Sequence, residues 1–145
     1  MTNWASDVAT AEASGLGREA VEASRVVLEI DGGAVVVQWS LSYHAYASLR
    51  GGPGRPAVAQ VQVMAVLERD GLEIARWTLA EDRAQGAKDD TVRAQVSGTA
   101  SGLFVDRAAG PGRKTYVLKV WNGRASPYGT AKIRVGTRTM ICEER

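Results

Sequence analysis

The feature that most constrains this chain is the alternation of apolar and polar side chains near its C-terminus. The runs 114–121 (KTYVLKVW) and 131–135 (AKIRV) alternate, and 137–144 (TRTMICEE) is a third strand-like run that ends one residue before the chain does. A side-chain period of two is typical of a β-strand with one buried face. We therefore expect the C-terminal residues to be held in a sheet, although the terminal residues of most domains are poorly ordered.

Alternating runs continue upstream, at 25–30, 34–46, 58–69, 72–79, 91–96 and 102–105. Asp70 and Gly71 separate two of them and favour a two-residue hairpin turn, because both turn positions require positive φ. This hairpin sets Leu67 opposite Ile74. About eight short strands joined by Gly- and Pro-rich loops predict an all-β, antiparallel β-sandwich of the jelly-roll type.

The first 24 residues differ from the rest and are rich in Ala, Ser and Glu. We expect residues 1–24 to form an N-terminal arm, either unordered or ordered against a partner with Trp4 as its anchor. A short helix over 14–23 is a second possibility. Residues 25–145 are expected to form one β-sandwich domain, because a chain of this size buries roughly two-thirds of its unfolded surface without disulfides or metals.

Charge and composition exclude several classes of protein. The net charge is +2, from 18 basic and 16 acidic side chains, and the arginines form no run. We therefore predict no binding to nucleic acid. The chain has no secretory signal and no apolar segment that could span a membrane, so we predict a protein made in the cytoplasm that does not bind membranes. Its single cysteine, Cys142, is predicted to be a small buried residue.

Residues that could carry chemistry do not form a recognisable site. His44 is the only histidine and has no carboxylate or nucleophile at a suitable spacing. The acidic residues Asp82, Asp89 and Asp90 lack the pattern of a calcium loop. The glycines of 51–55 lack the ending of a phosphate-binding loop. We predict no catalytic residue, no cofactor and no metal, and hence a protein that is not an enzyme.

Three tryptophans are the candidate interface residues. Trp77 and Trp121 fall on the strand faces opposite the alternating core positions, so both are expected to point outward, while Trp4 lies in the predicted arm. Exposed tryptophans often mark contacts with other proteins. The alternative is local packing, with each ring lying under a loop.

Three segments resemble a known family. Residues 66–75 (VLERDGLEIA), 105–120 (VDRAAGPGRKTYVLKV) and 137–144 (TRTMICEE) resemble the C-terminal head domains of tail fibres and related virion proteins of tailed phages. Those heads are similar to the trimeric jelly rolls of the C1q and tumour-necrosis-factor type. The shared motifs are a hairpin and a Gly-turned strand pair, so the resemblance implies a fold and an assembly but no catalytic residues.

The resemblance implies a non-enzymatic structural virion protein of a tailed phage or a phage-derived particle. It implies a homotrimer that other virion proteins hold through the N-terminal segment. No shaft precedes the head, which favours a capsid decoration protein, a head spike or a short tail component. The alternative is a receptor- or carbohydrate-binding module of a tail tip or fibre, with a host-surface glycan bound by the loops 50–56, 81–90 and 106–113.

Overall fold

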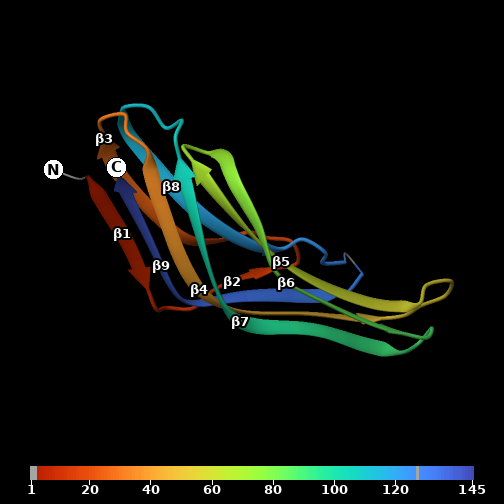
Figure 1. Ribbon diagram of the computed structural model, residues 1–145. Coiled ribbons are helices and arrows are strands. Elements are labelled where there is room, and N and C mark those ends of the chain that lie inside the picture. The colour runs from red at the N-terminus through yellow and green to blue at the C-terminus, as the bar shows by residue number, and fades with distance from the viewer. Residues whose placement is uncertain (1–2, 127) are drawn as a thin grey trace.

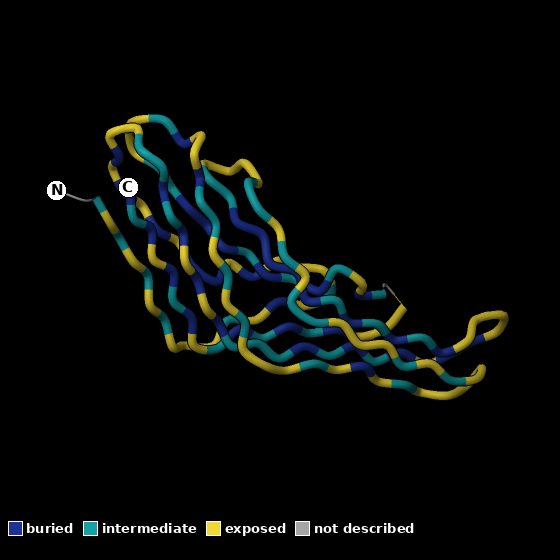
Figure 2. Tube along the Cα trace, in the orientation of Figure 1, coloured by how far each residue is buried: buried dark blue, intermediate teal, exposed yellow. Residues whose placement is uncertain are grey.

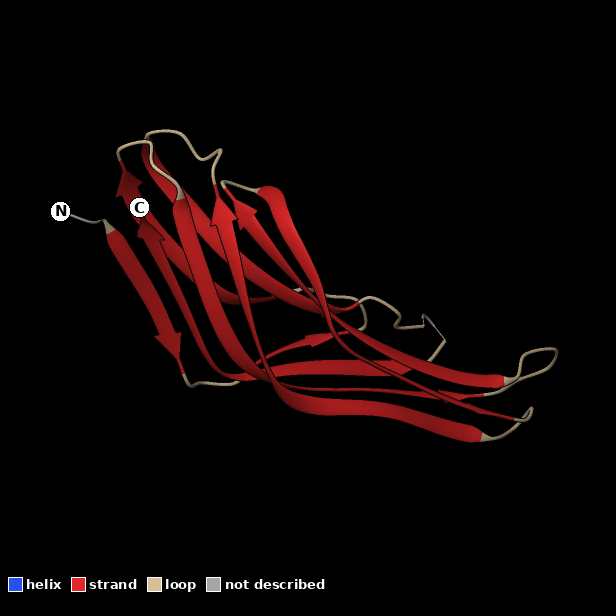
Figure 3. Ribbon diagram, viewed as in Figure 1, coloured by secondary structure: helices blue, strands red, loops and turns tan. Residues whose placement is uncertain are grey.

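A computed structural model describes residues 3–126 and 128–145, which form nine strands and no helix (Figure 1; Figure 3). Sheet A has the order β1-β9-β4-β7, with β2 also paired to β9. Its strands are β1 (Trp4–Ala9), β2 (Ala13–Leu16), β4 (Val35–Arg50), β7 (Thr91–Asp106) and β9 (Thr130–Glu144). Sheet B has the order β3-β8-β5-β6. Its strands are β3 (Val21–Ile30), β5 (Ala57–Arg69), β6 (Leu72–Gly86) and β8 (Gly112–Asn122).

The two sheets confirm the predicted all-β antiparallel sandwich. Because β1 and β2 pair with successive parts of β9, the described strands fill the eight positions of a jelly roll. The long strands of sheet A bend sharply near their middle (Figure 1). In that region the pairing of β4 with β9 shifts between Leu41 and Tyr43, so Ser42 of β4 faces both Gly136 and Thr137, and β9 has one extra residue. A bulge of this kind bends the strand that carries it.

The core lies between the sheets, and buried positions alternate with more exposed ones along much of β3, β4 and β9 (Figure 2). The core residues expected from the C-terminal alternation are all fully buried: Tyr116, Leu118, Val120, Ile133 and Val135. Cys142 is fully buried as predicted, and burial raises the pKa of its thiol to about 12.

Both chain ends lie at one end of the sandwich (Figure 1). The backbone N–H of Glu144 donates to the carbonyl of Asn3 at 2.8 Å, so the expected anchoring of the C-terminus in a sheet is confirmed. The Glu144 carboxylate also accepts hydrogen bonds from the backbone N–H groups of Asp31 at 2.9 Å and Gly33 at 2.6 Å. These bonds, that of Asp31 foremost, lower the pKa of Glu144 and fix the turn between β3 and β4.

The predicted helix over 14–23 is wrong, because this segment contributes to both sheets. Part of it forms β2, and the chain then turns at Gly17, where φ is +60°, and enters β3 at Val21. Pairing with β9 gives the backbone of β2 its hydrogen bonds, whereas a short helix with two glycines would be weak. β3 therefore runs across the predicted boundary at residue 24. Residues 1–2 of the predicted arm lie outside the described residues.

The hairpin at Asp70 and Gly71 is confirmed, with φ of 50° and 83°. Its predicted register is wrong by one residue, since Leu67 pairs with Ala75 rather than Ile74. The pairing shifts between Leu67 and Glu68, so Ile74 is an extra residue on β6. A bulge of this kind reverses the faces predicted for the residues that follow it, here up to Thr78, because a second shift leaves Leu79 as another extra residue.

β7 is one strand rather than the two short strands expected, and β6 extends to Gly86 through part of the predicted polar loop. The small residues near the middle of β7 have a packing role that spacing alone does not reveal. Gly102 pairs with Trp39 of β4, and Gly98 pairs with Tyr43. The Trp39 and Tyr43 rings fill the space that a side chain at each glycine would occupy. This packing allows β7 to continue through both glycines.

Replacing Gly102 with alanine is expected to destabilise the protein by about 1–3 kcal/mol. The added Cβ would lie 2.5 Å from three atoms of the Trp39 indole, which is 3% exposed and packs edge-on against Trp77 at 5.2 Å. Gly98→Ala is the matched control, because its Cβ would lie 3.2 Å from the partly exposed Tyr43 hydroxyl. Urea unfolding measures both, and equal losses would contradict this packing role.

Candidate functional site

The upper half of the outer face of sheet A carries an unusual set of exposed apolar side chains. Ile141 of β9 pairs with Ser6 of β1 and Gln38 of β4, and Gln38 pairs with Leu103 of β7. Directly paired residues share one face of a sheet. The exposed apolar residues of this region are Trp4 (66% exposed), Val8 (65%), Leu103 (57%) and Ile141 (38%), and we call them the apolar face.

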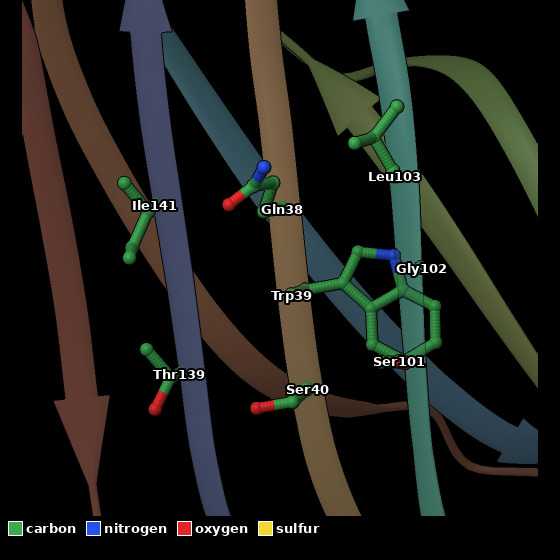
Figure 4. Close-up of a pocket in the computed structure, with 8 residues that line it drawn as sticks. All are labelled: Gln38, Trp39, Ser40, Ser101, Gly102, Leu103, Thr139 and Ile141. Carbon is green, nitrogen blue, oxygen red and sulfur yellow. The ribbon is translucent and has the colours of Figure 1, made fainter.

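A shallow hollow of about 480 Å³ lies within the apolar face (Figure 4). Ile141 projects from β9 and Leu103 from β7, on either side of Gln38 of β4. The short side chains of Ser40 and Ser101 line it, together with Thr139 and Gly102. The large side chains of Ile141 and Leu103 project from the surface, and the short polar side chains beside them leave the hollow.

Charge divides the outer face of sheet A in two. In the apolar half, Glu143 lies beside Arg145, with a closest approach of 3.4 Å. The lower half is basic, and its outward cations are Arg50, Arg93, Lys132 and Arg134, none of which forms an ion pair with a described residue. The Arg93 guanidinium lies 4.1 Å from the centre of the Tyr46 ring. The fold thus gathers cations that are scattered along the sequence.

The three predicted tryptophans do not meet at one surface. Trp4 lies on the exposed edge strand β1 and belongs to the apolar face. The outward orientation predicted for Trp77 is wrong, because it pairs with the core residue Ala65 and its ring contacts Trp39. The bulge at Ile74 places Trp77 inside. Trp121 lies half-buried on the outer face of sheet B, 5.3 Å from the Arg76 guanidinium.

The predictions missed Val8, Leu103 and Ile141, although two of these carry a sequence signal. Ile141 stands between Met140 and Cys142, and Leu103 stands before Phe104. Apolar residues at consecutive strand positions must place one side chain on each face. An apolar residue that breaks the alternation was therefore a sign of a second contact surface.

The other residues considered for catalysis or metal binding make contacts within the fold. Asp82 accepts the backbone N–H of Gln95 at 3.0 Å, and Asp90 accepts that of Ala87 at 2.8 Å. The His44 ring lies 6.5 Å from that of Tyr46, on the basic half of sheet A. Within residues 3–126 and 128–145, no group of His, Cys, Asp or Glu could hold a metal ion, and no helix is long and apolar enough to cross a bilayer.

Comparison with known proteins assigns no family to this chain. No protein-family model matches the chain, and no curated protein matches it. Among solved structures, a chain in "Structure of infectious bursal disease virus Gx strain" is similar with a TM-score of 0.40 and 7% sequence identity. The match covers all of this chain and 38% of the viral one. This likeness is too low to support an argument about family or function.

Proposed function

We propose that this protein is a non-enzymatic structural subunit of a tailed-phage or phage-derived particle, and that it self-associates through the apolar face of sheet A. The observation that carries the proposal is the exposure of Trp4, Val8, Leu103 and Ile141 on one face of one sheet. Exposed apolar groups gathered on one face often mark contact surfaces in soluble proteins. The likeness of segments 66–75, 105–120 and 137–144 to phage head domains supports the virion setting.

A closed trimer is the assembly we favour. Closed symmetry leaves no copy of the apolar face uncovered, whereas an open arrangement would propagate into a filament. Each apolar side chain that leaves water contributes roughly 25 cal/mol per Å² of buried area. The hollow beside Leu103 and Ile141 offers a place for a side chain of a neighbouring copy.

The N-terminal segment is the part that we propose contacts other virion proteins. Within residues 3–126 and 128–145, β1 pairs with β9 alone, so its other edge presents backbone N–H and C=O groups that no described strand pairs with. Such an edge can accept a strand of another protein. This arrangement suits a capsid decoration protein, a head spike or a short tail component.

Leu103→Asp and Ile141→Asp are each expected to weaken self-association by about 100-fold, because a charge would be buried without a partner. Both positions are exposed in the single chain, so folding should be retained. Size-exclusion chromatography with light scattering measures the mass across protein concentrations. Leu72→Asp is the matched control, since Leu72 is 62% exposed at the hairpin away from this face.

A wild-type protein that is monomeric at micromolar concentration would overturn the proposal. Retention of the wild-type mass in both aspartate variants would exclude the apolar face as the contact. Circular dichroism of each variant confirms that a loss of mass reflects dissociation rather than unfolding.

A further inference from the structure

A second hollow, of about 460 Å³, lies on the other side of the sandwich. Its lining includes Gln60 and Gln62 of β5, Glu81 and Arg83 of β6, and Arg124 from the turn after β8. Gln62 pairs with Glu81, and Gln60 pairs with Arg83, so these four side chains share the outer face of sheet B. The volume lies within the range of small-ligand sites.

A buried amide fixes the backbone around this hollow. Asn122 is fully buried, and its Oδ1 accepts the backbone N–H groups of Gln62 and Arg124, each at 3.0 Å. Its Nδ2 donates to the carbonyl of Gln60 at 3.4 Å. One side chain therefore holds three of the lining residues in place. A fixed backbone favours ligand binding, because less conformational entropy is then lost when the ligand binds.

The space beside Gln62 depends on a glycine. The backbone N–H of Gly123 donates to the Gln62 carbonyl at 2.8 Å. A Cβ at Gly123 would lie 2.9 Å from the Gln62 Oε1 and 3.7 Å from the Trp121 Nε1. A side chain at position 123 would therefore have to displace the Gln62 side chain, which lines the hollow.

The polar groups of this hollow are mixed in kind and in charge. Gln62 Nε2 donates to Glu81 Oε1 at 2.7 Å, which fixes both side chains in one orientation. Arg83 and Arg124 lie beside Glu81 in the lining, and neither arginine forms an ion pair with a described residue. Asp82 also borders the hollow, but its carboxylate turns to the opposite face of β6 and accepts the Gln95 N–H. A polyanion would meet the Glu81 carboxylate, and a polycation would meet the two guanidinium groups.

Hydroxyl groups suit this arrangement, because each one both donates and accepts a hydrogen bond without carrying charge. We infer that the hollow between β5, β6 and the turn at 123–124 binds a neutral saccharide. This site lies on sheet B and does not depend on self-association through sheet A.

The inference is tested by titrating the full chain with maltotriose, cellotriose, chitotriose and mannotriose, each to about 10 mM, and following binding by saturation-transfer NMR and calorimetry. Polysialic acid and heparin serve as charged comparators. We expect at least one neutral trisaccharide to bind saturably and neither polyanion to compete with it. No binding by any of the four, or binding by the polyanions alone, would overturn the inference.

Two variants locate the site. Gln62→Ala and Arg124→Ala are each expected to weaken saccharide binding by about tenfold, as the loss of one or two hydrogen bonds to a ligand would. Gln95→Ala and Arg113→Ala are the matched controls, because both residues are exposed on strands outside the hollow. Equal binding by the variants and the controls would refute the assignment. The mass of each variant in solution separates this outcome from a failure of the trimer proposal.

Discussion

Replacing Asp106 with alanine is expected to cost about 3–5 kcal/mol of folding free energy. The Asp106 carboxylate accepts two hydrogen bonds from Arg69, at 2.6 and 2.7 Å, and one from the Tyr116 hydroxyl at 2.8 Å. Its side chain is 4% exposed and that of Arg69 is 14% exposed. The substitution would leave a largely buried guanidinium and a fully buried phenol without their acceptor, which is more costly than losing the attraction alone.

The same carboxylate makes stability depend on pH. Burial raises the pKa of Asp106, but the hydrogen bonds from Arg69, Tyr116 and the Ala108 N–H lower it by more, so it lies below the usual 3.8. A lowered folded-state pKa gives a contribution that is complete above about pH 5 and is lost as the pH falls through 3.8 toward the folded-state value. Asp106→Asn should therefore flatten the acid side of the stability profile.

Urea unfolding of the wild type, Asp106→Ala and Asp106→Asn between pH 3 and 8 measures both effects. Glu29→Ala is the control, because Glu29 is an exposed carboxylate on β3 and forms no ion pair with a described residue. A loss in Asp106→Ala no larger than that of the control would show that this ion pair does not hold the upper end of the two sheets together.

Replacing Arg138 with methionine is expected to cost about 3 kcal/mol and to loosen β1 and β2 before the rest of the protein. Arg138 is only 9% exposed. Its Nε donates to the Ala23 carbonyl at 2.7 Å, and its Nη1 donates to the carbonyls of Ala11 and, at 3.0 Å, Gly136. One guanidinium therefore links the β1–β2 connection, β3 and the bulge of β9.

Methionine keeps much of the side-chain length but donates no hydrogen bond, so three carbonyls would lose their donor. Arg138→Lys should recover only part of the loss, because an ammonium group lacks the planar fork of a guanidinium. Hydrogen exchange over residues 4–16 reports the local loosening, and urea unfolding reports the global loss. Arg113→Met, at an exposed position, is the control. Equal protection of 4–16 in both methionine variants would contradict this role of Arg138.

The residues of the apolar face could be predicted from the sequence only in part. Trp4 was identified from its residue type, but Val8, Leu103 and Ile141 were not. Leu103 and Ile141 are 38 positions apart in the sequence, and they share one face because both β7 and β9 pair with β4, where Gln38 lies between them. The two bonds that hold Arg138 to Ala23 and Ala11 join residues 115 and 127 positions apart. No local pattern encodes such pairs.

The sequence by itself determined most strands after residue 24 and the inward faces of β8 and β9, because a period of two places every second side chain on the same side of an extended backbone. It also determined the turn at Asp70 and Gly71, since few residue pairs adopt positive φ there. Only the tertiary structure decided the position of Trp77, which a bulge at Ile74 turned inward. It also decided which exposed residues share a surface, because strand order and bulges depend on contacts between distant parts of the chain.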